Sequence, residues 1–108
     1  MIQIQNGDQL LLVLEALSNP YRLKILAILN QEKQYVSQLA RDLQISRPLL
    51  YLHLKKLEEA ELVQGHHEIS EFGKAMKYFE VTELSLLLNN QMIEEYAQTL
   101  TLKNKNNQ

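Results

Sequence analysis

The sequence contains no cysteine, which excludes disulfides, a thiol redox switch and a thiolate metal site. It has no run of about eighteen apolar residues, the length that a transmembrane helix needs. The opening residues MIQIQNGD lack the basic start of a signal peptide. Together these absences predict a cytoplasmic protein with no membrane partner.

The chain also lacks the sequence motifs of common catalytic sites. It has no nucleophile–base motif, no glycine-rich phosphate loop and no paired catalytic carboxylates, so we do not expect an enzyme. The remaining cluster of candidate metal ligands is His66-His67-Glu68. Neighbouring residues on a strand point to opposite faces, so the two histidines are poorly placed to share an ion. Surface histidines therefore fit better than a metal site, and we expect no cofactor.

What is present fits one small domain. Apolar residues make up 45% of the 108 residues and charged residues 22%, which is ordinary for a soluble globular protein. We expect a single domain over residues 1–102 and a flexible tail over residues 103–108. Hydrophobic spacing predicts a mainly α fold with a small β-hairpin, in the α+β class.

The charge is unevenly distributed along the chain. The net charge is −2, which by itself counts against a nucleic-acid-binding protein. The segment from Pro20 to Lys56, however, contains seven basic and two acidic residues. Its net charge is therefore +5, and the net charge of the rest of the chain is −7. This segregation favours a DNA-binding surface over that segment. A solvated basic face without a partner is the alternative.

The stretch from Val36 to Val63 predicts two helices joined by a tight turn. Ser37 is a good N-cap for a short first helix, whose apolar residues recur at helical spacing: Leu39, Ala40 and Leu43. Ser46 can cap the second helix, and Pro48 lies in its first turn, where a missing backbone N–H is tolerated. An apolar stripe follows, formed by Leu50, Leu54 and Leu57. This arrangement is typical of a helix-turn-helix.

Two helices are predicted before this motif. Asp8 is the expected cap of the first, which runs to Ser18 and carries more leucines than a single core contact needs. That excess indicates either a partner chain or deeper packing within the domain. Asn19 followed by Pro20 predicts the start of the second helix, which ends near Asn30. We expect the second helix to bury Leu23, Leu26, Ala27, Ile28 and Leu29.

Three strands and a long final helix complete the expected elements. Tyr35-Val36 predicts a short strand, and Leu62–Ile69 and Ala75–Val81 predict a hairpin around Gly73, whose backbone freedom suits a tip. Thr82 is the expected cap of a helix that runs to about Leu102. Little core remains for this last helix to cover, so its apolar side and that of the first helix predict a dimer interface. The predicted interface residues are Leu10, Leu11, Leu14, Leu84, Leu88, Met92 and Tyr96.

Three motifs carry a family resemblance. They read Ala16-Leu17-Ser18-Asn19-Pro20-x-Arg22-Leu23-x-Ile25-Leu26, then Leu43-x-Ile45-Ser46-x-Pro48, then His53-Leu54-Lys55-x-Leu57-x-x-Ala60-x-Leu62-Val63. This pattern resembles the winged-helix repressors of the arsenic-repressor (ArsR) type. The resemblance implies a winged helix-turn-helix with about five helices and a two- or three-stranded wing. It further implies a homodimeric transcriptional regulator that pairs its terminal helices and binds an inverted-repeat operator.

The sequence departs from that family at several positions. Tyr51 stands where a small polar residue is usual, and Glu61 where a glycine is usual, which puts the tight turn after the second helix in doubt. The cysteines of the metal-sensing branch are replaced by Tyr35-Val36-Ser37, and the expected terminal helix offers only Glu83, Glu94 and Glu95 as ligands. The resemblance therefore carries no metal site, and any effector is an unknown small molecule.

The second helix of the motif is the expected reader of DNA. In helix-turn-helix proteins its N-terminal part enters the major groove. Arg47 is best placed for a bidentate pair with guanine, Leu52 for a thymine methyl, and Tyr51 for a phosphate or sugar contact. Basic residues around it position the duplex without reading its sequence. The predicted DNA contacts are Ser46, Arg47, Pro48, Tyr51, Leu52, Lys55, Lys56, Arg41, Arg22 and Lys74.

Two alternatives stay open on the sequence alone. In the hairpin, Lys74 and Lys77 favour phosphate contacts whereas Glu68 and Glu71 oppose them, so the wing serves either DNA or only the domain core. An outward Leu52 beside Leu49, together with the acidic total, is compatible with a winged-helix module that binds another protein instead of DNA. Because DNA affinity falls steeply with salt, a salt titration separates the two functions.

Overall fold

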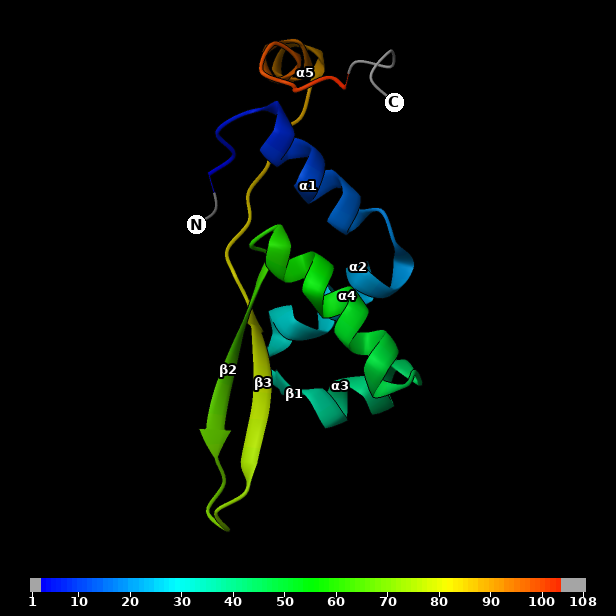
Figure 1. Cartoon of the computed structure of the whole chain (residues 1–108), viewed down its shortest axis with the longest axis vertical. Coiled ribbons are helices and arrows are strands. Elements are labelled where there is room, and N and C mark those ends of the chain that lie inside the picture. Colours follow the sequence, from blue (N-terminus) through cyan, green and yellow to red (C-terminus); the bar gives the residue numbers. More distant parts are fainter. Residues whose placement is uncertain (1–2, 104–108) are drawn as a thin grey trace.

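The computed structural model describes residues 3–103, and this part of the chain forms five helices and three strands (Figure 1). In chain order they are α1 (Gly7–Leu17), α2 (Pro20–Gln31), β1 (Gln34–Tyr35), α3 (Val36–Leu43), α4 (Arg47–Glu59), β2 (Val63–Ile69), β3 (Ala75–Val81) and α5 (Asn90–Ala97). The strands form one antiparallel sheet in the order β1-β3-β2. The predicted winged helix-turn-helix fold is confirmed. Of the expected tail, residues 104–108 lie outside the described residues.

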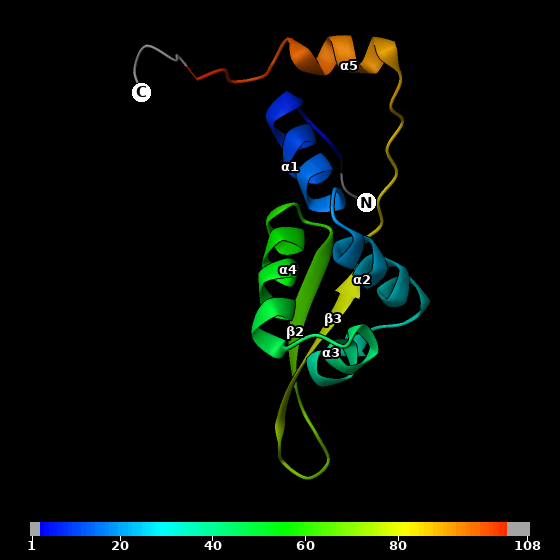
Figure 2. The same cartoon turned by 90° about the vertical axis from the view of Figure 1, so that its right-hand side faces the viewer.

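The molecule is elongated, with the β2–β3 hairpin at one end and α5 at the other (Figures 1 and 2). Its principal extents are 54 × 32 × 23 Å. Helices α2, α3 and α4 pack with the base of the hairpin in the middle, and α1 lies between this group and α5. Within residues 3–103, no helix has the length and apolar character needed to cross a membrane.

Two predicted helix starts are confirmed by their capping bonds. The Asn19 side chain accepts backbone N–H groups from Tyr21 at 2.8 Å and from Arg22 at 3.2 Å, and Pro20 is the first residue of α2. The Ser46 hydroxyl accepts the backbone N–H of Leu49 at 3.2 Å, which fixes the start of α4. Each cap satisfies N–H groups that have no partner within the helix.

Two other predicted caps are each wrong by two residues. Asn6, not Asp8, caps α1, because its side chain accepts the backbone N–H of Gln9 at 2.9 Å. Helix α3 begins at Val36, so Ser37 lies inside it, and no side chain caps its start. The expected strand at Tyr35-Val36 is accordingly Gln34–Tyr35.

The core lies where the stripe of α4 meets α3 and the sheet. Leu50, Leu54 and Leu57 are fully buried, as predicted, in a cluster that includes Leu39 and Phe79. Helix α2 is rotated relative to the expectation: Ile25 and Leu29 form its buried stripe, whereas Leu23 is 52% exposed and Ala27 is exposed. Leu26 and Ile28 are half-buried beside the cluster.

Two turns use a left-handed residue that is not glycine. Gln44, with φ of 56°, ends α3 and begins the turn of the helix-turn-helix. Glu61, with φ of 62°, stands at the turn after α4, where the N–H of Leu62 donates to the Leu57 carbonyl at 2.9 Å. The tight turn that Glu61 put in doubt therefore forms, at the roughly 1–2 kcal/mol cost of a left-handed L-residue.

The predicted helix from Thr82 to Leu102 is wrong for most of its length. The Thr82 N–H donates to the Leu62 carbonyl at 3.0 Å, and its hydroxyl donates to the Glu61 carbonyl at 2.8 Å. These bonds continue the strand pairing, so Thr82 does not cap a helix. Residues 83–89 are not helical, and α5 begins only after Asn89, whose side chain accepts the N–H of Met92 at 2.9 Å.

The N-terminus of α1 packs closely against the end of α5. The Gly7 N–H donates to the Thr99 hydroxyl at 2.7 Å, and a Cβ at Gly7 would lie 2.2 Å from the Tyr96 carbonyl oxygen. Asp8 accepts the backbone N–H of Thr101 at 2.9 Å and its hydroxyl at 2.6 Å. These bonds hold the Asp8 pKa below its ordinary value of 3.8.

Candidate nucleic-acid interface

The β2–β3 hairpin has two chemically different faces. Side chains alternate along a strand, so residues two apart share a face. The cross-strand pairs Val63↔Val81, Gly65↔Phe79, His67↔Lys77 and Ile69↔Ala75 therefore lie on one side, which we call the inner face. Val63 and Phe79, at its base, belong to the buried core that α4 shares. The inner face thus looks toward α4.

A cleft separates the inner face from the first turns of α4 and the start of α3. It encloses about 330 Å³, and its lining includes Arg47 and Tyr51 of α4 together with Lys74 and Lys77 of the hairpin. The other described residues that line it are Tyr35, Val36, Ser37, His67, Ala75 and Met76, so no carboxylate is among them. Lys77 Nζ lies 5.9 Å from the centre of the Tyr51 ring. The cleft therefore combines cationic groups from two separate elements.

The acidic side chains of the hairpin strands lie on the opposite, outer face. Glu68 accepts a hydrogen bond from the Tyr35 hydroxyl and lies 3.8 Å from Lys33 Nζ. Glu80 Oε1 is 2.9 Å from Nε2 of His66, whose ring stacks on Tyr78 at 5.1 Å. The bond to Glu68, assisted by burial and the carboxylate charge, raises the pKa of Tyr35. Glu68 is therefore bonded to Tyr35, lies near Lys33 and is not among the residues that line the cleft.

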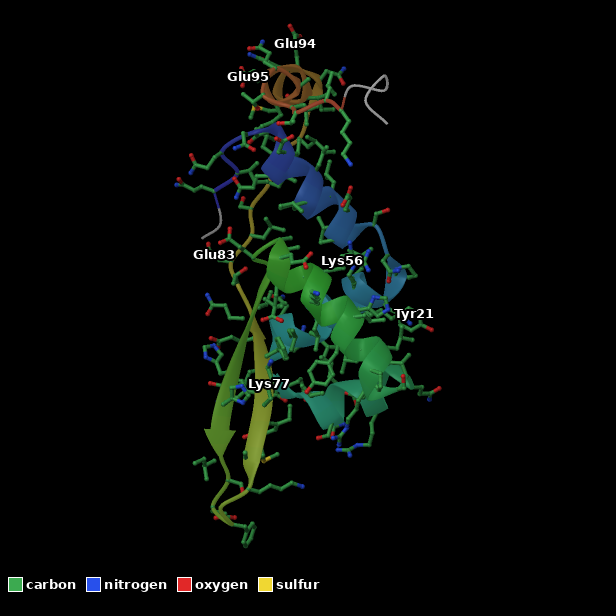
Figure 3. The ribbon with its side chains drawn as sticks, viewed as in Figure 1. Tyr21, Lys56, Lys77, Glu83, Glu94 and Glu95 are labelled. Atoms are coloured by element: carbon green, nitrogen blue, oxygen red, sulfur yellow. The ribbon has the colours of Figure 1, made fainter. Side chains whose placement is uncertain are left out.

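The outward side of α4 carries several of the predicted DNA contacts. Arg47, Tyr51, Lys55 and Lys56 are exposed, and Leu52 is 64% exposed. Figure 3 shows Lys56 on α4 and Lys77 on the hairpin. A second hollow of about 490 Å³ runs along the other flank of α4, lined by Arg22, Leu49, Leu52, His53, Lys55, Lys56 and Glu59. The exposed side of α4 therefore has, on each flank, a hollow whose lining includes cationic side chains.

Arg22, a predicted phosphate contact, directs its guanidinium into the protein. Its Nε donates to the Ala16 carbonyl at 2.7 Å and its Nη2 to the Glu15 carbonyl at 3.0 Å, at the end of α1. Its Nη1 donates to Nδ1 of His53 on α4 at 3.2 Å. The arginine therefore ties the last carbonyls of α1, which have no partner within the helix, to the recognition helix.

His53 accepts the bond from Arg22 as a neutral imidazole. Burial, and after it the charge of Arg22, lower the pKa of His53 from its ordinary value of 6.5. The ring also stacks on Tyr21, with 5.5 Å between ring centres. His53 is thus a helix residue packed against a neighbouring helix.

The remaining predicted contacts lie at the edges of this surface. Ser46 caps α4 and Pro48 lies in its first turn, both exposed. Arg41 donates to the Gln38 side chain at 2.8 Å on α3. Lys74 lies next to the hairpin tip and lines the cleft.

Of the residues that line the cleft, the predicted contact set contains Arg47, Tyr51 and Lys74 and omits seven, including Ser37, His67 and Lys77. On the sequence alone, Lys77 is a candidate phosphate contact of the hairpin. The alternation of the hairpin is the sequence signal for two of them, because His67 and Lys77 fall in register with the buried Val63 and Phe79. Ser37 was assigned to a cap instead. No signal along the chain indicates that the start of α3 lies beside the hairpin.

The predicted interface residues lie at the α1–α5 end of the molecule. Leu11 and Leu88 are exposed, whereas Leu10 is buried within the protomer and Leu84 packs against the core. Leu14, Met92 and Tyr96 are half-buried. Additional exposed apolar side chains at this end are Leu12, Leu87 and Ile93.

Over residues 3–103, no group of three or more His, Asp or Glu side chains is placed to hold a metal ion.

Comparisons with known proteins agree on one family. The profile described as "Bacterial regulatory protein, arsR family" matches residues 19–64. The chain is 41% identical, over 75% of its length and 84% of the relative's, to an uncharacterized HTH-type transcriptional regulator of Methanocaldococcus jannaschii. Among solved structures it is similar to HlyU from Vibrio cholerae, with a TM-score of 0.63, 25% identity and coverage of 75% of this chain and 83% of that one.

A third comparison is with the homodimeric winged helix-turn-helix DNA-binding domain Mb0332 from Mycobacterium bovis, described as a possible ArsR-family regulator. The TM-score is 0.61 at 27% identity, covering 68% of this chain and 64% of that one. The fold, the family profile and the relatives together show that the chain belongs to the arsR family of transcriptional regulators and carries its winged helix-turn-helix DNA-binding domain.

Proposed function

We propose that this regulator is a homodimer that binds an inverted-repeat operator, with the first turns of α4 in the major groove and the inner face of the hairpin beside them. The observation that carries the proposal is the cleft in which Arg47 of α4 and Lys74 and Lys77 of the hairpin meet without a carboxylate. Cationic groups from two elements, facing one side, match the phosphate backbone of a duplex.

Within this arrangement the side chains have different roles. Arg47 donates a bidentate pair to a guanine, worth about 1–3 kcal/mol of discrimination, and Leu52 contacts a thymine methyl. Lys55, Lys56, Lys74 and Lys77 hold phosphates and carry no sequence information. Arg22 is left out of this set because its guanidinium is bonded within the protein.

The α1–α5 end is the proposed dimer contact. Exposed apolar side chains on α1 and around α5, including Leu11, Leu88 and Ile93, support this assignment. The homodimeric state of the Mycobacterium bovis domain supports it further. Two recognition helices related by a two-fold axis read half-sites about one helical turn apart, so the operator is an inverted repeat.

The proposal is tested by selecting duplexes from a random pool and measuring their binding across salt concentrations. We expect a palindromic consensus and an affinity that falls steeply as salt rises. Arg47→Ala lowers affinity for the selected duplex and relaxes preference at one base pair, by roughly 5- to 150-fold. Lys55→Ala and Lys56→Ala weaken all duplexes about equally and reduce the salt slope.

Arg41→Ala is the matched control, because Arg41 is exposed and bonded to Gln38 on α3. It removes the same charge as Arg47→Ala and leaves the consensus unchanged. An unaltered consensus in Arg47→Ala removes that residue from readout. Failure to select any duplex, together with salt-insensitive capture of a protein through Leu49 and Leu52, overturns DNA binding in favour of a protein-interaction module.

A further inference from the structure

We propose that Phe72 and Ile69, at the tip of the hairpin, form an apolar wedge that enters the minor groove beside the half-site read by α4 and opens a base step there. This inference rests on the proposed DNA binding and deepens it, because it assigns a second element that selects sequence. The two residues are called the apolar tip below.

The apolar tip has no partner within the described protomer. Phe72 is 88% exposed and Ile69 is 74% exposed, the former more than any other large apolar side chain of residues 3–103. Burial of such a side chain against a partner is favourable, because it removes apolar surface from water. The tip therefore offers its side chains to a partner outside the protomer.

The backbone holds the tip in one conformation. The Ser70 N–H donates to the Lys74 carbonyl at 2.8 Å, and the Gly73 N–H donates to the Ser70 carbonyl at 2.9 Å. The Lys74 N–H donates to the Ser70 hydroxyl at 3.1 Å. Gly73 supplies the left-handed φ of 80° that closes the turn. Phe72 is thus presented by an ordered turn, and binding costs less conformational entropy than ordering a loose loop.

The surroundings of the tip identify DNA as its partner. Ile69 pairs with Ala75 on the inner face, directly after the His67↔Lys77 pair that lines the cationic cleft. Lys74 also lines that cleft. The apolar tip therefore continues the proposed DNA surface outward along the hairpin, whose turn extends beyond the helices (Figure 1). Glu71 is the opposing charge at the tip and is exposed.

An apolar side chain at this position has a known physical use on DNA. Minor-groove proteins insert Phe, Leu or Ile between base steps, which unstacks the step and bends the duplex. Pyrimidine–purine steps such as TA and CA open most easily. The wedge consequently favours such a step on the outer flank of each half-site, at a position that α4 does not contact.

The test uses the full chain and its selected duplex, with 2-aminopurine placed in turn at each flanking base. Binding of the wild-type protein raises the fluorescence at one flanking step, because unstacked 2-aminopurine is no longer quenched. Phe72→Ala abolishes this rise and lowers affinity about 10- to 100-fold, as loss of an aromatic–base contact does. Phe72→Leu keeps an apolar wedge and retains most of both signals.

Glu71→Gln is the matched control in the same turn: it removes a charge, keeps the wedge and leaves the fluorescence rise in place. Equal affinity and equal fluorescence for Phe72→Ala and wild type overturn the wedge while DNA binding by α4 stands. A flat fluorescence signal with strong Phe72-dependent binding to a protein or a lipid vesicle assigns the tip to that partner and also overturns it. If the wild-type chain selects no duplex, both proposals fail together.

Discussion

The α4–hairpin end and the α1–α5 end of this molecule expose different kinds of surface. At the first end the stripe Leu50, Leu54 and Leu57 of α4 is buried in a finished core, and charge faces outward around Arg47 and Lys77. The exposed apolar side chains of this end include Leu49, Leu52 and the apolar tip. At the second end α5 has no buried residue, and leucines on both sides of it are exposed. The first end therefore has its own core within a protomer, whereas α5 adds no residue to a core.

This contrast assigns a different partner to each end. A surface of cations over a finished core suits a polyanion, because binding requires no rearrangement of the core. A surface of leucines suits another apolar surface, and a second copy of the chain supplies one by symmetry.

Leu54→Ala has the largest expected effect, because it removes a side chain from the core at the α4 end. Leu54 is fully buried in the core. Truncation removes apolar contacts and leaves a cavity, which lowers the free energy of unfolding by about 2–5 kcal/mol. Leu52→Ala on the same helix is the control, since Leu52 is largely exposed and its truncation changes stability by about 0.5 kcal/mol or less. Urea denaturation measures both; equal losses contradict the assigned rotation of α4.

At the other end, Leu88→Ala and Ile93→Ala weaken the dimer. Both side chains are exposed in the protomer, so truncation leaves its own fold intact. Each change raises the dissociation constant of the dimer about tenfold, equivalent to about 1.4 kcal/mol. Sedimentation across protein concentration measures the effect, with Leu23→Ala as the control, because Leu23 is an exposed leucine of α2 outside the proposed contact. A dimer that is equally stable in all four proteins assigns the contact to another surface.

The middle of the chain was predictable because its signals are local. Asn19-Pro20 and Ser46 mark helix starts through bonds to residues two or three positions away. Gly73 marks the hairpin tip through its own backbone. Such bonds can be inferred from spacing alone, so the elements between Asn19 and Val81 follow closely from the sequence.

Features that depend on a distant partner could not be predicted from the sequence. Thr82 looks like a helix cap, but Leu62, twenty residues earlier, takes its N–H into strand pairing. Arg22 looks like a surface cation, but the end of α1 and His53 bind its guanidinium. Lys77 and Arg47 line the same cleft only because the hairpin folds against α4. None of these arrangements can be inferred from the spacing of the residues in the sequence.

Glu61→Gly tests the junction between the two ends, at the turn from α4 into β2. Glu61 has a left-handed φ of 62°, which glycine adopts without strain. We expect the free energy of unfolding to rise by roughly 1 kcal/mol, because removal of strain at a left-handed position outweighs the added freedom of the unfolded chain. Glu61→Gln is the control for loss of charge. An increase in both variants attributes the effect to electrostatics rather than to the backbone.

His53 provides a pH test of the α4 end. Its pKa is lowered in the folded state, so between that value and 6.5 the unfolded chain binds a proton that the folded chain does not. Stability is therefore full above pH 6.5 and declines as the pH falls through this window. His53→Gln removes the decline, and His67→Gln, which alters an exposed histidine of the cleft, keeps it. Unfolding measured every half pH unit checks this; a decline that persists in His53→Gln moves the titration elsewhere.

Asp8 provides the corresponding test of the α1–α5 end, at lower pH and with the smallest expected effect. Its folded pKa lies below 3.8 because Thr101 donates two hydrogen bonds to the carboxylate. Asp8 therefore contributes to the stability of the folded state above pH 3.8, and this contribution is lost as the pH falls through the folded pKa. Acidification should therefore act in two steps: a first one from His53, which starts as the pH falls below 6.5, and a second one from Asp8 below pH 3.8, which loosens the α1–α5 contact. Asp8→Asn abolishes the second step and keeps the first in amide hydrogen exchange. If hydrogen exchange at both ends instead changed in a single step, α1 would transmit the change from one end to the other. Arg22→Lys, which weakens the link from α1 to His53, would then separate the two steps.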